Sequence, residues 1–310
     1  MRLVFFGTPE FAVPALRALI GEGFDLSAVV TQPDRPQGRS RSRLIPPPVK
    51  DVAAAEALPV LQPEHPDDPA FLDALRPYAP DLGIVIAYGH ILKPTLLALP
   101  THGMINVHAS LLPALRGAAP IQHAVIQGLE ETGITIMQMD QGMDTGPILH
   151  QVPTPIATDE TAGELEIRLA ELGALALIEA LALLEAGVLQ SRPQDDTRVS
   201  YAPKLTVEGA RIAWTEGAAQ VARCLRGLDP RPGAWTELSD RRIKLFGPRP
   251  AGGVPASADP GEIVETDPAL LVATGDGLLQ ILDVQPEGKA RLSASEWVRG
   301  RGARPGDRFR

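Results

Sequence analysis

The first two hundred residues alternate short apolar runs with longer segments of helical periodicity, and this alternation restricts the possible folds more than any other feature. The apolar runs are rich in Val and Ile and have the length of buried strands; they cover residues 3–6, 27–31, 82–87, 104–107 and 134–139. Helical patterns cover residues 11–21, 69–75, 119–127 and 161–186. Such alternation predicts an α/β domain with a Rossmann-like, mostly parallel sheet that carries helices on both faces.

The carboxyl ends of the predicted strands are the expected place for functional residues, because ligands of such sheets bind there. Gly7, Tyr88, His108 and Asp140 stand at or just after these ends. The first turn reads GTPEF rather than G-x-G-x-x-G. The sequence therefore lacks the fingerprint of a dinucleotide-binding enzyme.

The chain changes character from about residue 191. Residues 188–210 are polar and turn-prone, and short apolar runs separated by Gly and Pro follow at 211–214, 234–238, 242–246, 262–265, 270–273 and 278–284. This pattern predicts a small OB-like β-barrel, with helices near 217–228 and 294–300. We expect a catalytic domain over residues 1–190, a linker over 191–207 and a C-terminal β-barrel domain over 208–310.

Composition excludes several classes of protein. Hydrophobic residues make up 44% and charged residues 22% of the 310 residues, which is ordinary for a soluble globular protein. The first apolar run is too short for a signal peptide, and the longest later one, 174–184, is too short to span a membrane. We expect a monomeric cytoplasmic protein without a membrane partner. The single cysteine, Cys224, rules out a disulfide framework, and we expect no metal.

The charge of the chain is unevenly distributed. The net charge is −9, yet residues 34–50 carry only Asp34 as an acid against a set of cations made up of Arg35, Arg39, Arg41, Arg43 and Lys50. A basic surface on an acidic protein can dock a polyanion, because local fields decide where such a partner binds. A solvated loop explains the same charges equally well.

Acid–base chemistry near neutral pH belongs to the first domain, because all six histidines precede residue 151. His108 follows Asn106 by two residues, so strand alternation places both on one side of the sheet. An amide donor and an imidazole that converge at a strand end could stabilise an oxyanion. Taken alone, a polar pair that satisfies backbone groups is the commoner explanation of this pattern.

A glycine-punctuated loop with two acids follows the predicted strand at 134–139. Aspartate in such a loop is more often a turn residue than a base, and Asp140 fits that description. Asp144 lies between Gly142 and Gly146, so a ligand could approach it closely without steric penalty.

Several longer runs form a colinear set that extends over nearly the whole chain. They are FFGTPEFAVPAL at 5–16, TQPDRPQGR at 31–39, AYGHIL at 87–92, NVHASLLP at 106–113, RGAAPIQHAVIQG at 116–128, TGITIMQMDQGMDTGPIL at 132–149 and VATGDGLLQI at 272–281. These runs resemble the folate-dependent formyltransferase superfamily, and in particular its members that formylate methionyl-tRNA. Chance does not explain agreement of this extent.

The resemblance implies a formyl transfer from 10-formyltetrahydrofolate to an amine, without a metal. It places the catalytic trio of the superfamily on Asn106, His108 and Asp144, and the folate-binding segment on Ser110, Leu111, Leu112 and Pro113. One departure is visible, because Ala114 and Leu115 stand where the superfamily usually has a basic residue and an aromatic one. Ala114 and Leu115 cannot make the contacts of a basic and an aromatic side chain.

The resemblance also implies an initiator methionyl-tRNA as the partner. By this resemblance the basic window, residues 34–50, is an insertion that contacts the acceptor stem of the tRNA. Its tRNA-binding candidates are Arg39, Arg41 and Arg43. In the second domain the candidate phosphate contacts are Arg211, Arg242, Lys244 and Lys289. Two alternatives stay open: another folate-dependent formyltransferase or a formyltetrahydrofolate hydrolase, which would share the trio, and a non-catalytic RNA-binding protein, which would not need it.

Overall fold

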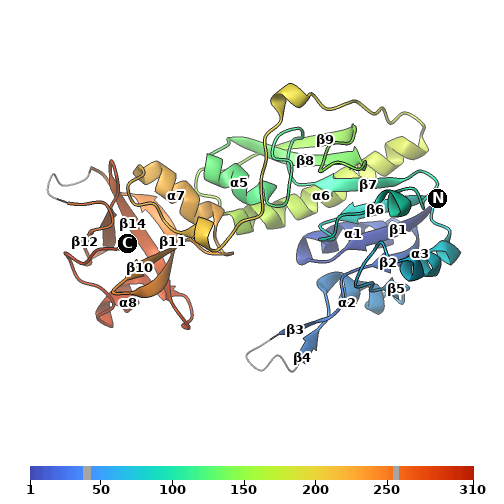
Figure 1. Ribbon diagram of the computed structural model, residues 1–310. Coiled ribbons are helices and arrows are strands. Elements are labelled where there is room, and N and C mark those ends of the chain that lie inside the picture. The colour runs from blue at the N-terminus through green and yellow to red at the C-terminus, as the bar shows by residue number, and fades with distance from the viewer. Residues whose placement is uncertain (38–42, 254–257) are drawn as a thin grey trace. The chain divides into compact units, whose positions relative to one another are not determined.

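The computed structural model describes residues 1–37, 43–253 and 258–310, and it contains two compact units (Figure 1). The first comprises Met1–Pro120, Glu131–Pro155 and Glu166–Ala202, and the second comprises Ile121–Glu130, Ile156–Leu165 and Pro203–Arg310. The expected domain limits at residues 190 and 207 stay a prediction.

The first unit is built on a seven-stranded sheet with the order β5-β2-β1-β6-β7-β8-β9. Its strands are β1 (Arg2–Gly7), β2 (Asp25–Val30), β5 (Val60–Leu61), β6 (Leu82–Ile86), β7 (Met104–His108), β8 (Glu131–Gln138) and β9 (Ile148–Pro155). The pairs from β5 to β7 are parallel, whereas β8 and β9 run antiparallel to their neighbours. The mostly parallel sheet expected from the sequence is confirmed.

Helices cover both faces of this sheet, as expected. They are α1 (Val13–Gly21), α2 (Pro48–Ala55), α3 (Pro69–Leu75), α4 (Pro94–Leu97) and α6 (Ala162–Glu185), with the short 3-10 helices η1 (Glu10–Ala12), η2 (Arg76–Tyr78) and η3 (Asp196–Arg198). On one face, Phe71 of α3 and Leu96 of α4 pack in a core with Met104 of β7. On the other face, Gly173 of α6 lies against Val107 of β7.

The first unit contains several elements that were not expected from the sequence, among them the short elements α2, α4 and β5. The window 34–50, expected as a loop, contains an antiparallel hairpin of β3 (Arg35–Gln37) and β4 (Arg43–Ile45). Strand β9 is not among the expected strands, and its Pro153 and Pro155 are unfavourable in the middle of a sheet. The topology resolves this conflict, since β9 is an edge strand, where prolines are tolerated.

The second unit is built on an antiparallel sheet with the order β10-β11-β14-β13-β12, and β15 pairs with β14. Its strands are β10 (Trp235–Leu238), β11 (Arg241–Pro250), β12 (Ile263–Glu265), β13 (Leu270–Ala273), β14 (Leu278–Pro286) and β15 (Leu292–Ser293). Its helices are α5 (Pro120–Gln127), α7 (Ala218–Gly227), α8 (Ala294–Arg299) and the 3-10 helix η4 (Glu208–Ala210). The expected small OB-like β domain is confirmed.

The core of the second unit is aromatic. Trp214, Trp235, Trp297 and Phe309 are all buried, and the rings of Trp214 and Phe309 are stacked. The prediction of a strand at 211–214 is wrong, because this segment makes only an isolated bridge from Arg211 to Trp235. Trp214 instead enters the core, where its indole nitrogen donates to the Thr236 hydroxyl at 3.0 Å.

Within the described ranges, no helix combines the length and the apolar character needed to cross a membrane.

Candidate active site

His108 is the last residue of β7, and its ring is buried with 6% of the residue exposed. Its Nε2 lies 3.1 Å from the carbonyl oxygen of Leu115. A carbonyl oxygen only accepts, so Nε2 carries a proton and donates it to Leu115. This contact leaves Nδ1 as the ring nitrogen that can act on another group.

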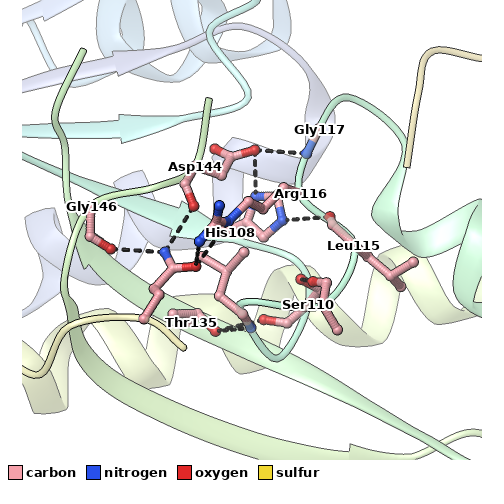
Figure 2. Close-up of polar contacts among 11 residues, drawn as sticks. His108, Ser110, Leu115, Arg116, Gly117, Thr135, Asp144 and Gly146 are labelled. Atoms are coloured by element: carbon pink, nitrogen blue, oxygen red, sulfur yellow. Dashed lines mark hydrogen bonds and ion pairs between the residues drawn. The ribbon is translucent and has the colours of Figure 1, made fainter. Parts of the chain in front are cut away.

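Asp144 lies on the side of the ring that Nδ1 faces (Figure 2). Its Oδ2 is 3.7 Å from His108 Nδ1, which is too long for a direct hydrogen bond. The same oxygen accepts a hydrogen bond from the Gly117 backbone nitrogen at 2.8 Å. The carboxylate is therefore held in place beside the ring, where it attracts positive charge that develops when the ring takes up a proton.

The loop between β8 and β9 presents Asp144 in a left-handed backbone conformation, with φ of +56°. Aspartate tolerates this conformation better than most residues. Asp140 has the different role that its sequence context favoured. Its Oδ1 accepts from the Gly142 nitrogen at 2.9 Å and from the Thr145 hydroxyl at 2.6 Å, so it closes the turn.

Asn106 lies two residues before His108 on β7 and is half-buried. Val107, between them, faces α6, so strand alternation puts Asn106 and His108 together on the opposite face. Among the described residues, the Asn106 amide has no hydrogen-bond partner. It is therefore available to donate to a substrate, and the roles of the three residues stay a prediction.

The predicted folate-binding segment is a tightly bonded turn. The Ser110 hydroxyl donates to the Ala114 carbonyl at 2.6 Å. Thr135 of β8 donates to the Ser110 carbonyl at 2.6 Å and accepts from the Leu112 nitrogen at 3.1 Å. Gln151 of β9 donates to the Leu112 carbonyl at 2.9 Å. The segment is thus fixed to two strands, and its residues Leu111, Leu112 and Pro113 line a cavity of about 420 Å³.

The departure at residues 114–115 leaves the contact with His108 intact. Leu115 is buried, and both of its interactions in the site come from the backbone. Its carbonyl accepts from His108, and its nitrogen donates to the Ser200 hydroxyl at 2.9 Å. Because backbone atoms make these contacts, they do not require the aromatic side chain that the superfamily usually has.

Residues 192–202, expected as part of a linker, form an extended segment that lies along the site. Arg192 and Ile148 exchange two backbone hydrogen bonds. Further along, the Arg116 nitrogen donates to the Ser200 carbonyl at 2.9 Å, and the Ala202 nitrogen donates to the Arg116 carbonyl at 2.8 Å. No sequence pattern indicates this role, because the segment shows neither strand nor helix periodicity.

The basic window is anchored at its base by one carboxylate. Lys50 Nζ lies 2.7 Å from Asp34 Oδ1, and the Gln62 amide donates to the same oxygen at 2.8 Å. The hydrogen bonds from Gln62 and Lys50 hold the pKa of the Asp34 carboxyl below its usual value. Arg43 begins β4, whereas Arg39 and Arg41 lie outside the described residues.

Three of the four candidate phosphate contacts in the second unit already have partners within it. Arg242 stacks on the Trp235 ring at 3.9 Å, Arg211 pairs with Glu237 at 3.4 Å, and Lys244 donates to a backbone carbonyl at 2.6 Å. Lys289 is exposed. Their roles in RNA binding stay a prediction.

In the part of the chain that the structure describes, no group of three or more His, Cys, Asp or Glu residues could hold a metal ion.

Both the N-terminal and the C-terminal part of this chain are similar in sequence to known proteins. The family described as "Formyl transferase" matches residues 1–181, and "Formyl transferase, C-terminal domain" matches residues 204–302. The methionyl-tRNA formyltransferase of Syntrophus aciditrophicus is 47% identical over 301 residues, covering 96% of this chain and 95% of its own. That of Geobacter sulfurreducens is 46% identical over 310 residues, covering 100% and 96%. The chain belongs to the formyl transferase family.

Solved structures share the fold at low sequence identity. HypX from Aquifex aeolicus, in complex with tetrahydrofolic acid, superposes with a TM-score of 0.67 at 19% identity, covering 96% of this chain and 47% of that one. The methionyl-tRNA formyltransferase from Clostridium thermocellum superposes with a TM-score of 0.57 at 13% identity, covering 80% and 93%. These similarities establish the fold.

Proposed function

We propose that this protein transfers the formyl group of 10-formyltetrahydrofolate to the amino group of methionyl-tRNA, giving N-formylmethionyl-tRNA for translation initiation. Methionyl-tRNA formyltransferases of three bacteria match 96–100% of this chain at 45–47% identity. The observation that carries the chemistry is the buried His108 ring held beside Asp144, with Asn106 on the same face of the sheet. Both substrates arrive from solution, so the protein's part is to orient them and to stabilise charge.

The reaction begins when the amine nitrogen attacks the formyl carbon and forms a tetrahedral intermediate with a negative oxygen. The Asn106 amide donates to that oxygen, and His108 donates to it from Nδ1 once that nitrogen has taken the proton that the amine sheds; such a donor typically contributes about 2.7–4 kcal/mol. Collapse of the intermediate breaks the bond between the formyl carbon and N10 of the folate. The amine loses one proton and N10 gains one, and Asp144 with His108 mediates this transfer. No covalent bond to the protein is required.

The folate and tRNA contacts follow the same proposal. Ser110, Leu111, Leu112 and Pro113 line the folate, and Arg39, Arg41 and Arg43 bind the acceptor end of the tRNA. Residues 1–190 carry the catalytic site, residues 191–207 link it, and residues 208–310 bind the body of the tRNA. The protein acts as a monomer in the cytoplasm, on the initiator methionyl-tRNA.

A radiolabelled formyl donor tests the proposed function directly. The acceptors are initiator methionyl-tRNA, elongator methionyl-tRNA, free methionine and an amino sugar nucleotide. We expect rapid labelling of the initiator methionyl-tRNA and none of free methionine or the sugar. Labelling of the sugar alone, release of free formate, or RNA binding without transfer would each contradict the proposal in favour of one of the alternatives.

A triple variant, Arg39→Ala with Arg41→Ala and Arg43→Ala, is expected to weaken productive tRNA binding. An ion pair at a protein surface contributes up to about 1 kcal/mol, so loss of three such contacts should raise KM for methionyl-tRNA by up to about 10²-fold. Each lost phosphate contact should also reduce the slope of log affinity against log salt by about 0.9. Measuring KM and affinity between 50 and about 200 mM salt, the range in which this effect is large, tests both.

The matched control removes three arginines of the first unit that lie outside the proposed sites: Arg2→Ala, Arg17→Ala and Arg76→Ala. It changes the net charge by the same amount. We expect its salt slope to stay close to that of the wild type. Equal slopes in both triple variants would show that the window contributes only through net charge, against the proposal.

A further inference from the structure

Gln194 connects the loop that carries Asp144 to a buried arginine. Its side-chain nitrogen donates to the carbonyl oxygens of Asp144 and Gly146, both at 2.8 Å. Its side-chain oxygen accepts from Arg116 Nε at 3.0 Å and from Nη2 at 2.8 Å. All the usual hydrogen-bonding positions of this amide are therefore occupied.

The chemistry of these partners fixes the orientation of the amide. Arginine only donates, so the oxygen of Gln194 must face Arg116. The two backbone carbonyls only accept, so the nitrogen must face Asp144 and Gly146. The reversed amide would lose all four bonds. A residue in this position thus needs both an acceptor and a double donor at the end of a side chain of this length.

Arg116 is itself immobilised. Only 4% of the residue is exposed, and its Nη2 also lies 2.9 Å from Asp196 Oδ1. Its backbone is bonded on both sides to the 192–202 segment, through the Ser200 carbonyl and the Ala202 nitrogen. The arginine therefore provides a fixed point within the first unit against which Gln194 can hold the loop.

The loop needs this support, because Asp144 has a left-handed backbone conformation. Such a conformation is costly for a residue with a side chain, and it persists when surrounding contacts enforce it. Gln194 bonds the carbonyl of Asp144 itself and that of Gly146, two residues later (Figure 2 shows the acceptor oxygen of Gly146 beside the site). Together with Gly117, which bonds the carboxylate, it determines where Asp144 lies relative to His108.

We propose that Gln194 is a positioning residue for formyl transfer, which holds the Asp144 loop so that the carboxylate stays beside His108. This inference rests on the proposed function, and it adds to that function a residue from a segment that the sequence indicated only as a linker. Gln194 acts through Asp144 and not through either substrate, so it affects the chemical step and leaves substrate binding intact.

The variant Gln194→Met tests this role, because methionine has a similar length but neither the donors nor the acceptor. We expect kcat to fall by about 10–10²-fold, the effect of a displacement of about 1 Å at a reacting group. KM for the folate and for methionyl-tRNA should each stay within about twofold, since the interaction lost is made to Asp144 alone. Steady-state kinetics with a labelled formyl donor gives both values, and a thermal melt confirms that the variant folds.

The variant Gln194→Glu separates the two ends of the amide. Its carboxylate still accepts from Arg116 but places an oxygen, not a donor, against the carbonyls of Asp144 and Gly146. We expect it to lose as much kcat as Gln194→Met, although its bond to Arg116 is retained. Wild-type kcat in Gln194→Glu would overturn the proposal, because it would show that the hydrogen bonds from Gln194 to the carbonyls of Asp144 and Gly146 are not needed for turnover.

A double-mutant cycle with Asp144→Asn distinguishes positioning from a general structural role. In the Asp144→Asn background the carboxylate charge is already gone, so the position of this loop has little effect on the rate. Gln194→Met should therefore reduce the single-turnover rate of that variant by less than about threefold. Losses that multiply fully in the double variant would overturn the proposal.

The control Gln138→Met removes a half-buried glutamine whose amide donates to the His102 carbonyl at 3.3 Å, and we expect its kcat to be unchanged.

Failure of the positioning proposal and failure of the proposed function give different results. If the wild-type protein does not formylate methionyl-tRNA, the function itself is wrong. If the wild type is active and Gln194→Met retains full kcat, or raises KM while kcat stays constant, only the role of Gln194 is wrong.

Discussion

Replacing Asp144 by asparagine, or His108 by alanine, is expected to lower kcat for formyl transfer by about 10²–10⁴-fold while the protein still folds. Asp144→Asn is nearly isosteric, and its side-chain oxygen can still accept from Gly117, so the change removes the charge and keeps the shape. His108→Ala removes the ring that Leu115 and Asp144 hold between them. Single-turnover kinetics with a labelled formyl donor gives the rates, and circular dichroism checks folding.

Matched variants of exposed residues in the same unit provide the controls. His102→Ala and Asp73→Asn change the same residue types away from the site, and we expect wild-type kcat in both. Near-full turnover in Asp144→Asn or in His108→Ala would remove the basis of the catalytic assignment. A loss of the same size in the two control variants would show that the effect is not specific to the site.

Gly146→Ala is expected to disturb the site through the backbone. A Cβ atom at this position would lie 1.8 Å from the carbonyl oxygen of Gln138, far inside any tolerable contact. The obstacle is backbone in a paired strand, so the loop itself must move, and Asp144 moves with it. We expect a destabilisation of about 1–3 kcal/mol, as for other overpacked positions, and a fall in kcat of about 10²-fold.

Gly21→Ala is the matched control for this clash. Gly21 is the last residue of α1, and no atom lies within 4 Å of the position that a Cβ would occupy. Alanine there should stabilise the protein by about 0.5–1 kcal/mol or leave it unchanged. Chemical denaturation measures both variants. Gly146→Ala with wild-type stability and kcat would mean that the loop has an alternative conformation that keeps Asp144 in place.

The elements that the sequence predicted well are those whose signal is local. Helix α3 has the expected bounds, Pro69–Leu75, because its N-cap Asp68 and its apolar face are close together in the chain. Strand β13 also has its expected bounds, Leu270–Ala273. Strand β9 was missed, since its prolines are acceptable only at a sheet edge and no local pattern reveals which strand lies there.

Two residues of the predicted trio could be identified from the sequence, but the backbone contacts that hold them in place could not. His108 and Asp144 could be singled out from residue type and from the resemblance, and the structure brings them within 3.7 Å. The atoms that hold them could not be predicted. The Leu115 carbonyl and the Gly117 nitrogen are backbone atoms, which every residue possesses, so their identity carries no sequence signal.

The order of the apolar and polar residues was enough to predict the α/β class of the first unit and the small β domain of the second, whereas the proposed site residues were singled out through the resemblance to known formyltransferases. The two domain classes follow from periodicity and side-chain chemistry, which are written locally along the chain. Only the tertiary structure decided that Gln194, 50 residues after Asp144, bonds its carbonyl, and that β9 is an edge strand. Contacts between distant segments depend on how the whole unit packs, and no short stretch of sequence encodes them.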